Sequence, residues 1–226
     1  MEHVNELTST IALALGVGWA SGLNLYAVIL VLGLLGVTGN MVLPANLEVL
    51  MNPLVIGAAG LMYLVEFFAD KTPVVDSGWD AVHTFIRIPA GAVLAAGALG
   101  EVNPAMAVAA GIMGGGLAAS SHVLKAGSRV LINTSPEPFT NWTASVLEDV
   151  AAVGGLWMAL RHPWLFIVML AAFLILLFWV LPKLWRGIKS LFSAIGRLFG
   201  HKPTPAATGR EVTAAVGGGS EPLGRN

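Results

Sequence analysis

The stretch Glu66–Arg87, EFFADKTPVVDSGWDAVHTFIR, sets the central problem of this fold. It holds seven ionisable side chains, namely Glu66, Asp70, Lys71, Asp76, Asp80, His83 and Arg87. On both sides of it the chain is rich in alanine, leucine, valine and glycine. A charge near the centre of a bilayer costs at least about 2.5 kcal/mol. If the apolar flanks cross a membrane, these side chains therefore need partners or a wet cavity.

The composition indicates a membrane protein. Of the 226 residues 56% are hydrophobic and 11% are charged, whereas about one quarter of a soluble domain is charged. Apolar runs of about twenty residues recur, and each is long enough to cross a hydrocarbon core of about 30 Å. The absence of cysteine from the sequence excludes disulfides, thiolate metal sites and cysteine nucleophiles.

Six membrane spans are predicted from the apolar runs and from pairs that end in proline. Asn52-Pro53 and Asn103-Pro104 are typical of an N-cap followed by proline in the first helical turn, and His162-Pro163 resembles them. The expected fold class is all-α, a polytopic membrane helix bundle. The six spans cover about residues 9–37, 53–70, 78–99, 104–132, 141–160 and 164–182.

The first and fourth spans are longer than a hydrocarbon core requires. About 29 residues at 1.5 Å each extend over roughly 43 Å. Each has a centre of small residues, GVGWASGLN at 16–24 and GIMGGGLAASSH at 111–122. Three explanations stay open: strong tilt, a break into half-helices, or glycines that let neighbouring helices pack closely.

The order of the spans suggests an internal repeat. In each half a long glycine-rich span precedes a shorter one that carries carboxylates, Glu66 in the first half and Glu148 with Asp149 in the second. Three spans place the second half upside down relative to the first, and inverted repeats are typical of secondary transporters. We therefore expect a 3+3 inverted repeat.

The chain changes character after residue 182. Residues 183–200 carry an apolar helical stripe with basic residues mostly elsewhere, which predicts an amphipathic helix on the membrane surface, drawn to anionic lipids. Residues 201–226 are rich in Pro, Gly, Thr and Ala, and we expect them to be disordered. The remaining domain, 1–182, is expected to be membrane-embedded.

The basic residues predict the orientation. Seven of the twelve Lys and Arg residues lie at or after Lys183, which favours a cytoplasmic C-terminus. An even number of spans places the N-terminus in the cytoplasm as well. We expect a multi-pass protein of the bacterial inner (cytoplasmic) membrane, whose oligomeric state the sequence does not indicate.

A polar stripe runs along the third span. Asp76, Asp80, His83 and Arg87 are spaced so that they share one helical face. Asp76 is well placed to cap the helix, and Ser77 with Asp80 fits the capping-box spacing. Arg87, about ten residues into the span, is too deep to face lipid comfortably.

A second polar stripe lies on the fourth span. Its members recur at steps of three and four residues: Ser121, His122, Lys125, Ser128, Arg129 and Asn133. Either the two stripes pair to hold the bundle together, or they line a path. We favour the path, because desolvation largely cancels the attraction within a buried ion pair.

The site residues follow from these stripes. The predicted substrate-binding residues are Arg87, His83, His122, Lys125, Arg129 and Asn133. The predicted coupling carboxylates are Glu66, Asp70, Asp80, Glu148 and Asp149. The nucleophile-elbow, P-loop, H-E-x-x-H and Rossmann patterns are missing, so we expect no enzyme, catalytic residue or cofactor. A metal site at His83 and His122 is only weakly indicated, and no nucleic-acid partner is expected.

Three stretches resemble a known family. SGLNLYAVILVLGLLG (21–36), EFFADKTPVVDSGWDAVHTFIRIPAG (66–91) and PEPFTNWTASVLEDV (136–150) look like the bacterial membrane family catalogued as domain of unknown function 4126. The resemblance covers about residues 8–182 and implies a multi-span membrane protein without an established activity. EFFADKT is also similar to the E-x-G-D-(K/R)-(T/S) motif of cation/proton exchangers built from two three-span halves, with a gap one residue longer and Ala69 in place of glycine.

Four candidate functions stay open, including a membrane enzyme. The first is a transporter or translocase for a small charged solute or an anionic lipid headgroup, coupled to protons or cations. The second is a divalent-cation exporter, favoured by eleven Asp and Glu against five Lys and Arg before Lys183. The third is a membrane scaffold whose charges pair internally. A membrane enzyme would have to rely on His83, His122 and the carboxylates as its acid and base groups.

Overall fold

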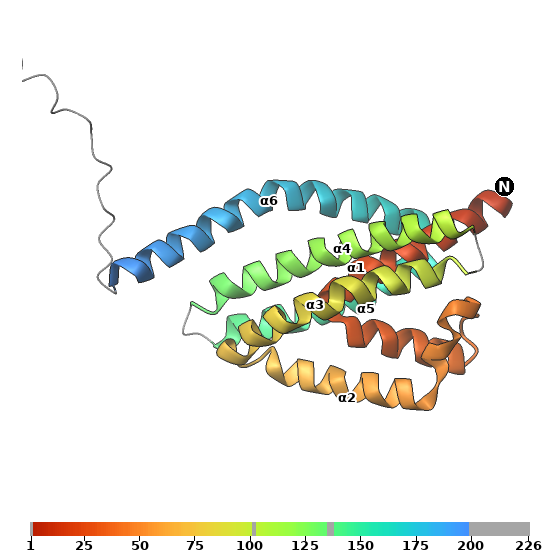
Figure 1. Ribbon diagram of the computed structural model, residues 1–226, viewed down its shortest axis with the longest axis horizontal. Helices are drawn as coiled ribbons and strands as arrows, with labels where there is room; N and C mark the ends of the chain where they lie inside the picture. Colours follow the sequence, from red (N-terminus) through yellow and green to blue (C-terminus); the bar gives the residue numbers. More distant parts are fainter. Residues whose placement is uncertain (1, 101–102, 135–137, 199–226) are drawn as a thin grey trace, which may run out of the picture. The chain divides into compact units, whose positions relative to one another are not determined.

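The computed structural model describes residues 2–100, 103–134 and 138–198 (Figure 1). These residues form helices and connections, without a strand among them, so the all-α prediction is confirmed. The helices are α1 (Glu2–Val37), the 3₁₀-helix η1 (Ala45–Met51), α2 (Pro53–Ala69), α3 (Pro73–Ala98), α4 (Pro104–Ile132), α5 (Pro138–Arg161) and α6 (Pro163–Leu198). The chain divides into two compact units, and the bundle belongs to the unit that ends at Lys189.

The helix starts at Pro53, Pro104 and Pro163 confirm the boundaries predicted from proline, whereas α3 begins earlier than expected, with Thr72 rather than Asp76 as its N-cap. Five of the helices, α2 to α6, begin with a proline. The Asn52 side chain accepts a hydrogen bond from the Leu54 N–H at 2.9 Å, and Asn103 accepts one from Ala105 at 2.8 Å. Both asparagines therefore act as N-caps for the helices that follow.

The helices have the length and composition of membrane spans. Five of them are long and apolar enough to cross a bilayer, and the pair η1 and α2, bent by 68°, makes a sixth. The protein is thus a multi-pass membrane protein. Strong tilt, a break and close packing were the explanations left open for the two longest predicted spans. The structure favours a break in α1 and close packing in α4.

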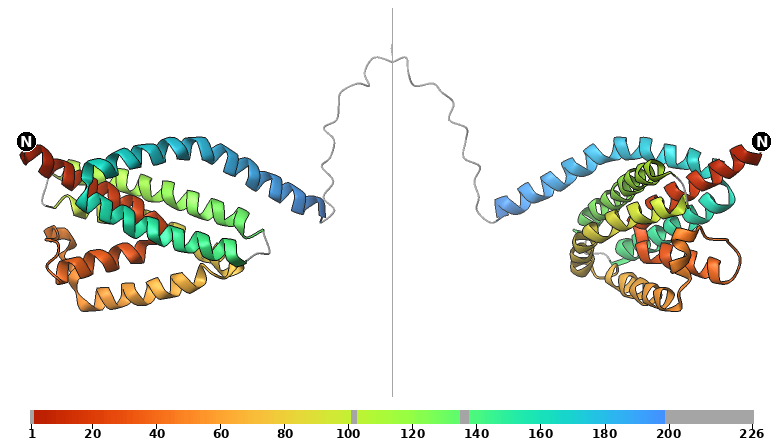
Figure 2. Two further views of the ribbon diagram at one scale, coloured as in Figure 1. Left: turned by 180° about the vertical axis from the view of Figure 1, so that it is seen from behind. Right: turned by 45° about the vertical axis from the view of Figure 1, so that its right-hand side comes forward.

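The helix α1 is broken at Asn24, where φ is −149° and ψ is 97°. The chain then runs back beside its own first half (Figures 1 and 2). Ser9 and Thr10 from the first half line the same cavity as Leu35 and Asn40 from the end of the second. Both ends of α1 therefore lie at one end of the bundle, and α1 is a helical hairpin.

The break has a local cause. The Asn24 side-chain Oδ1 accepts a hydrogen bond from the Ala27 N–H at 2.9 Å, which is the bond of an N-cap to the third residue of its helix. Its extended backbone is also that of an N-cap. Asn24 thus begins a new helix within the apolar run, just after Gly22.

The helix α4 is continuous, and its glycines serve close packing. A Cβ on Gly18 of α1 would lie 2.6 Å from the Gly114 Cα, and a Cβ on Gly91 of α3 would lie 2.6 Å from the Ala118 Cβ. Only hydrogen at these positions lets α1, α3 and α4 approach so closely. Close packing is therefore the explanation that holds for α4.

The reversal of α1 changes the predicted topology. Asn40 follows α1, Ala98 ends α3 and Arg161 ends α5, and all three line one cavity. The connections after these three helices therefore lie at one end of the bundle, which we name the Arg161 end. At the opposite Lys71 end, a Cβ on Gly127, near the end of α4, would contact Leu184 of α6. The start of α1 and the part of α6 around Leu184 therefore lie at opposite ends, as the courses of α1 and α6 in Figure 1 show. The prediction of both termini on one side assumed that α1 crosses once, and the side on which each terminus lies stays a prediction.

The 3+3 inverted repeat is not confirmed. It requires three crossings in each half, and the first half instead contains a hairpin followed by α2 and α3. The helix α4, which the predicted repeat pairs with α1, is continuous and has no such reversal.

The helix α6 continues through Pro182 to Leu198, so residues 183–198 extend the last apolar helix, and their place on the membrane surface stays a prediction. A proline removes one backbone hydrogen bond, which neighbouring groups compensate within membrane helices. The tail at 201–226, predicted to be disordered, lies outside the described residues.

An apolar cluster fills the bundle towards the Arg161 end. It joins both halves of α1 to η1, α3 and α5, and its members Val17, Leu32 and Leu156 are fully buried. The polar side chains gather on the other side of this cluster, towards the Lys71 end.

Candidate functional site

Seven charged side chains form one ion-pair network, which we name the charged cluster. They come from α2, α3, α4, α5 and the turn after α2: Glu66, Asp70, Asp80, Arg87, Lys125, Arg129 and Glu148. Six of these side chains are at most 3% exposed, and Glu148 is 15% exposed. The two predicted polar stripes thus face each other, together with carboxylates from α2 and α5.

Arg87 joins α3 to α2. Its Nη2 lies 2.6 Å from Glu66 Oε1, and its Nη1 lies 3.3 Å from Asp80 Oδ1. A guanidinium has five donors, so one arginine can serve several acceptors at once. Nη1 is also 3.4 Å from the Gly22 carbonyl oxygen on α1.

Lys125 lies in the middle of the cluster. Its Nζ is 2.8 Å from Asp70 Oδ2, 3.4 Å from Glu66 Oε1 and 3.6 Å from Glu148 Oε2. Asp80 Oδ1 lies somewhat farther, at 3.9 Å. A compact ammonium suits this position because it attracts acceptors from every direction.

Arg129 holds α4 against α5. Its Nε and Nη2 donate to the two carboxylate oxygens of Glu148 at 3.1 and 2.7 Å, a forked pair. Its Nη1 donates to the Asp70 carbonyl oxygen at 3.1 Å and to the side-chain oxygen of Asn141. Asn141 is buried at 2% exposure, and this contact explains a buried amide in the first turns of α5.

The break in α1 meets the charged cluster. Lys125 Nζ lies 3.4 Å from the Leu23 carbonyl oxygen, and Ser121 Oγ donates to the Trp19 carbonyl oxygen at 2.7 Å. These carbonyls end the first half of α1 and form the negative pole of its dipole. At the start of the second half, Asn24 Nδ2 donates to Asp149 Oδ1 at 2.9 Å.

Carboxylates outnumber cations at this site. The cluster holds four carboxylates against three cations, and Asp76 and Asp149 lie beside it. Asp76 Oδ2 accepts from Asn133 Nδ2 at 2.9 Å, so Asn133 contacts a carboxylate rather than a cation. One buried oxygen on each of four carboxylates finds no hydrogen-bond partner among the described residues: Glu66, Asp70, Asp76 and Asp80. The site therefore has acceptors to spare for protons or small cations.

The two histidines lie at the margin of the cluster. His122 Nδ1 is 3.2 Å from Arg87 Nη1, and its Nε2 is 2.7 Å from Thr84 Oγ1. Because arginine only donates, Nδ1 accepts and His122 is neutral in this arrangement. His83 is farther out, with Nε2 3.0 Å from the Tyr26 hydroxyl and its ring stacked on Trp79.

A metal centre is not preassembled within the described part of the chain, where no three His, Asp or Glu side chains are arranged to hold an ion. The histidines are separated from the carboxylates by Tyr26, Thr84 and Arg87, which take their ring nitrogens.

The structure brings most of the predicted site residues together. Arg87, Lys125 and Arg129 pair directly with Glu66, Asp70, Asp80 and Glu148. The predicted residues His83, His122, Asn133 and Asp149 flank this group. Sequence reasoning missed Asn24, Tyr26, Thr84 and Asn141. Only Asn24 had a usable signal, since it is a capping residue inside an apolar run.

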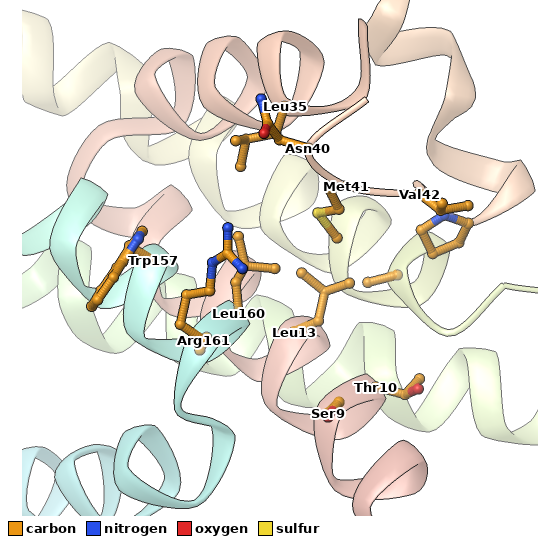
Figure 3. Close-up of a pocket in the computed structure, with 13 residues that line it drawn as sticks. Ser9, Thr10, Leu13, Leu35, Asn40, Met41, Val42, Trp157, Leu160 and Arg161 are labelled. Carbon is orange, nitrogen blue, oxygen red and sulfur yellow. The ribbon is translucent and has the colours of Figure 1, made fainter. Parts of the chain in front are cut away.

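The side chains of the charged cluster are almost entirely buried. A cavity of about 540 Å³ lies at the Arg161 end, lined by residues from α1, the segment after it and the end of α5 (Figure 3). The apolar cluster around Val17, Leu32 and Leu156 lies between that cavity and the charges. Glu148 is the most exposed member of the cluster, at 15%.

Comparison with known protein families shows which family this chain belongs to. The sequence profile of the family described as domain of unknown function 4126 matches residues 11–183. The chain belongs to this family. The matched region of the family contains every member of the charged cluster and the break at Asn24. Neither the curated proteins nor the solved structures gave a match. The similarity to cation/proton exchangers is not supported.

Proposed function

We propose that this member of the family is a secondary transporter. It moves a small anionic solute or lipid headgroup, and the buried carboxylates carry the coupling protons or cations. The observation that carries this proposal is the break of α1 inside the bundle, where both of its inner ends meet the charged cluster. Secondary transporters bind substrates and ions at such discontinuous helices near the bilayer midplane.

The energetics favour a functional cluster over a purely structural one. Buried ion pairs add little net stability, because desolvation offsets the attraction. Close contacts between small residues, such as Gly18 with Gly114, already hold α1 against α4. A scaffold would also need no excess of carboxylates over cations.

The pairing pattern suggests how coupling works. Lys125 and Arg129 are both held by carboxylates, Asp70 and Glu148 above all. Protonation of these carboxylates removes the charge that holds the two cations. The freed cations then attract an anion, with Arg129 as a forked donor and Lys125 as a point charge. Proton uptake and anion binding thus favour each other at one site.

The orientation follows from the basic residues. Lys71, Lys183, Arg186 and Lys189 favour a cytoplasmic position for the Lys71 end. The Arg161 end and the start of α1 then face outward. We place the protein in the cytoplasmic membrane of a bacterium, with the segment from Lys183 drawn to anionic lipids.

The test uses the full chain in proteoliposomes with a pH-sensitive dye inside. Probes are inorganic phosphate, acetate, fluorescent phosphatidylglycerol and Mn²⁺, each supplied with and without an inward proton gradient. Arg129→Ala should lower anion or lipid flux at least about tenfold, because a charge-assisted hydrogen bond is worth roughly 1.5–3 kcal/mol. Glu66→Gln should reduce the proton-driven part. Arg186→Ala, exposed on α6, is the matched control.

The outcomes separate the candidate functions. Mn²⁺ flux that needs Glu66 and survives Arg129→Ala would identify a divalent-cation exporter, which the excess of carboxylates also favours. Folded variants that move every probe as the parent does, or a parent that moves none of them, would leave the cluster with a scaffold role.

A further inference from the structure

The cavity at the Arg161 end is separate from the charged cluster. It lies between the two halves of α1, the segment after α1 and the end of α5 (Figure 3). Its volume of about 540 Å³ is that of a small-molecule site. The site proposed above contributes no residue to it, so it poses a question of its own.

The lining divides into an apolar body and a polar part. Leu13, Leu35, Met41 and Trp157 are among the apolar residues. Ser9, Thr10, Asn40 and Arg161 form the polar part. Such a lining fits a molecule with an apolar body and one polar head.

Arg161 sets the sign of that head. Its guanidinium points into the cavity (Figure 3). It is the only charged side chain among the described lining residues, and no ion pair or hydrogen bond to it is found within the described chain. An arginine fork is suited to carboxylate or phosphate, which it binds through two parallel hydrogen bonds.

The hydroxyl groups are already engaged as donors. Ser9 Oγ donates to the Asn5 carbonyl oxygen at 2.8 Å, and Thr10 Oγ1 donates to that of Glu6 at 3.0 Å. They therefore offer polar surface without a competing negative charge. Arg161 also lies in the last turn of α5, where a cation balances the helix dipole. That role requires no cavity beside it.

We propose that this cavity binds an amphipathic anion. The phosphate or carboxylate lies on Arg161, and the apolar body lies against Leu13, Met41 and Trp157. The anion comes either from the membrane, as an anionic lipid, or from solution, as an organic acid with an apolar tail. This proposal does not rest on transport by the charged cluster.

Trp157 provides the readout, because bromine atoms quench the fluorescence of a nearby indole. The full chain is placed in phosphatidylcholine vesicles with brominated phosphatidylglycerol, or with brominated phosphatidylcholine at the same fraction. In a further arm 11-bromoundecanoate is added from solution. The cavity signal is the difference in fluorescence quenching between the parent and Trp157→Phe. The other six tryptophans are present in both proteins, so the subtraction cancels their contribution.

The expected result is quenching by a brominated anion at about one tenth of the concentration that a neutral lipid needs. Quenching by phosphatidylglycerol assigns the lipid source, and quenching by bromoundecanoate alone assigns the soluble source. Arg161→Gln should lose the preference, Arg161→Lys should keep part of it, and Arg186→Gln should keep all of it. Equal quenching by charged and neutral probes in the parent would overturn the proposal. A preference that survives Arg161→Gln would overturn it as well.

Discussion

The helices α1 and α4 start from similar sequences and reach different structures. Both are long, apolar and rich in glycine, and they pack against each other through Gly18 and Gly114. The helix with three consecutive glycines, 114–116, stays straight, whereas α1 breaks and turns back. Glycine content therefore does not decide where a membrane helix breaks.

The difference lies in what receives the freed backbone groups. At the break, Asn24 caps the new helix, and Arg87, Ser121 and Lys125 approach the last carbonyls of the old one. Without such partners each unpaired group in a membrane costs several kcal/mol. Ser121 and Lys125 lie on α4, so an unbroken α4 places these two partners at the break in α1.

The largest effect is expected for Arg87→Met. The change leaves Glu66 with Lys125 as its remaining cation and removes a donor from the Gly22 carbonyl. Breaking a buried ion pair by removing one partner costs about 3–5 kcal/mol. Thermal unfolding of the purified protein in detergent measures this loss. Arg186→Met, which removes an exposed arginine of α6, should change the transition little; equal losses would contradict a role of Arg87 at the break.

A smaller effect is expected for Gly22→Ala on α1. Its Cβ would overlap the Ala118 carbonyl oxygen and Ser121 Oγ, so the two helices must separate. Overpacking of this kind costs about 1–3 kcal/mol. Gly116→Ala on α4 is the matched change, because a Cβ there meets no atom of the described chain within 4 Å. It should be neutral or stabilising by up to about 1 kcal/mol, since alanine favours helix. Equal unfolding transitions for the two variants would show that the helices do not touch at Gly22.

The smallest effect is expected at the caps. Asn24→Ala removes the N-cap of the second half of α1 and the bond to Asp149, at a cost of about 1 kcal/mol. Asn103→Ala removes the corresponding cap of α4, but Asn103 is exposed and water can replace it. Hydrogen exchange should therefore speed up in residues 25–37 for the first variant, and change less in residues 104–132 for the second. If residues 25–37 stay as protected as in the parent, Asn24 does not hold the break.

Much of the architecture is visible in local patterns. Asn52 and Asn103 with the prolines after them predict two helix starts, and both caps form as expected. The spacing of Asp80, Arg87, Lys125 and Arg129 predicts two polar faces, because side chains at these steps share one side of a helix. Pairing of the two faces was one of two alternatives that the sequence left open, because an unpaired charge in a membrane is costly.

Other features could not be predicted from the residues alone. Asn24 is visible as a capping residue inside an apolar run, but whether the helix breaks there depends on Arg87 and Lys125 arriving from other helices. The inverted repeat and the shared side of the termini were both inferred from counting spans, and the reversal of α1 changes that count.

A bundle of membrane helices with two charged helical faces could be predicted from the residues of each segment taken separately. Composition, proline boundaries and helical spacing act within one segment and need no partner. The reversal of α1, the pairing of each carboxylate with its cation, and the cavity with one arginine at the other end appear only when the helices are packed together. Backbone groups and charges in a membrane are stable only when paired, and their partners come from distant segments.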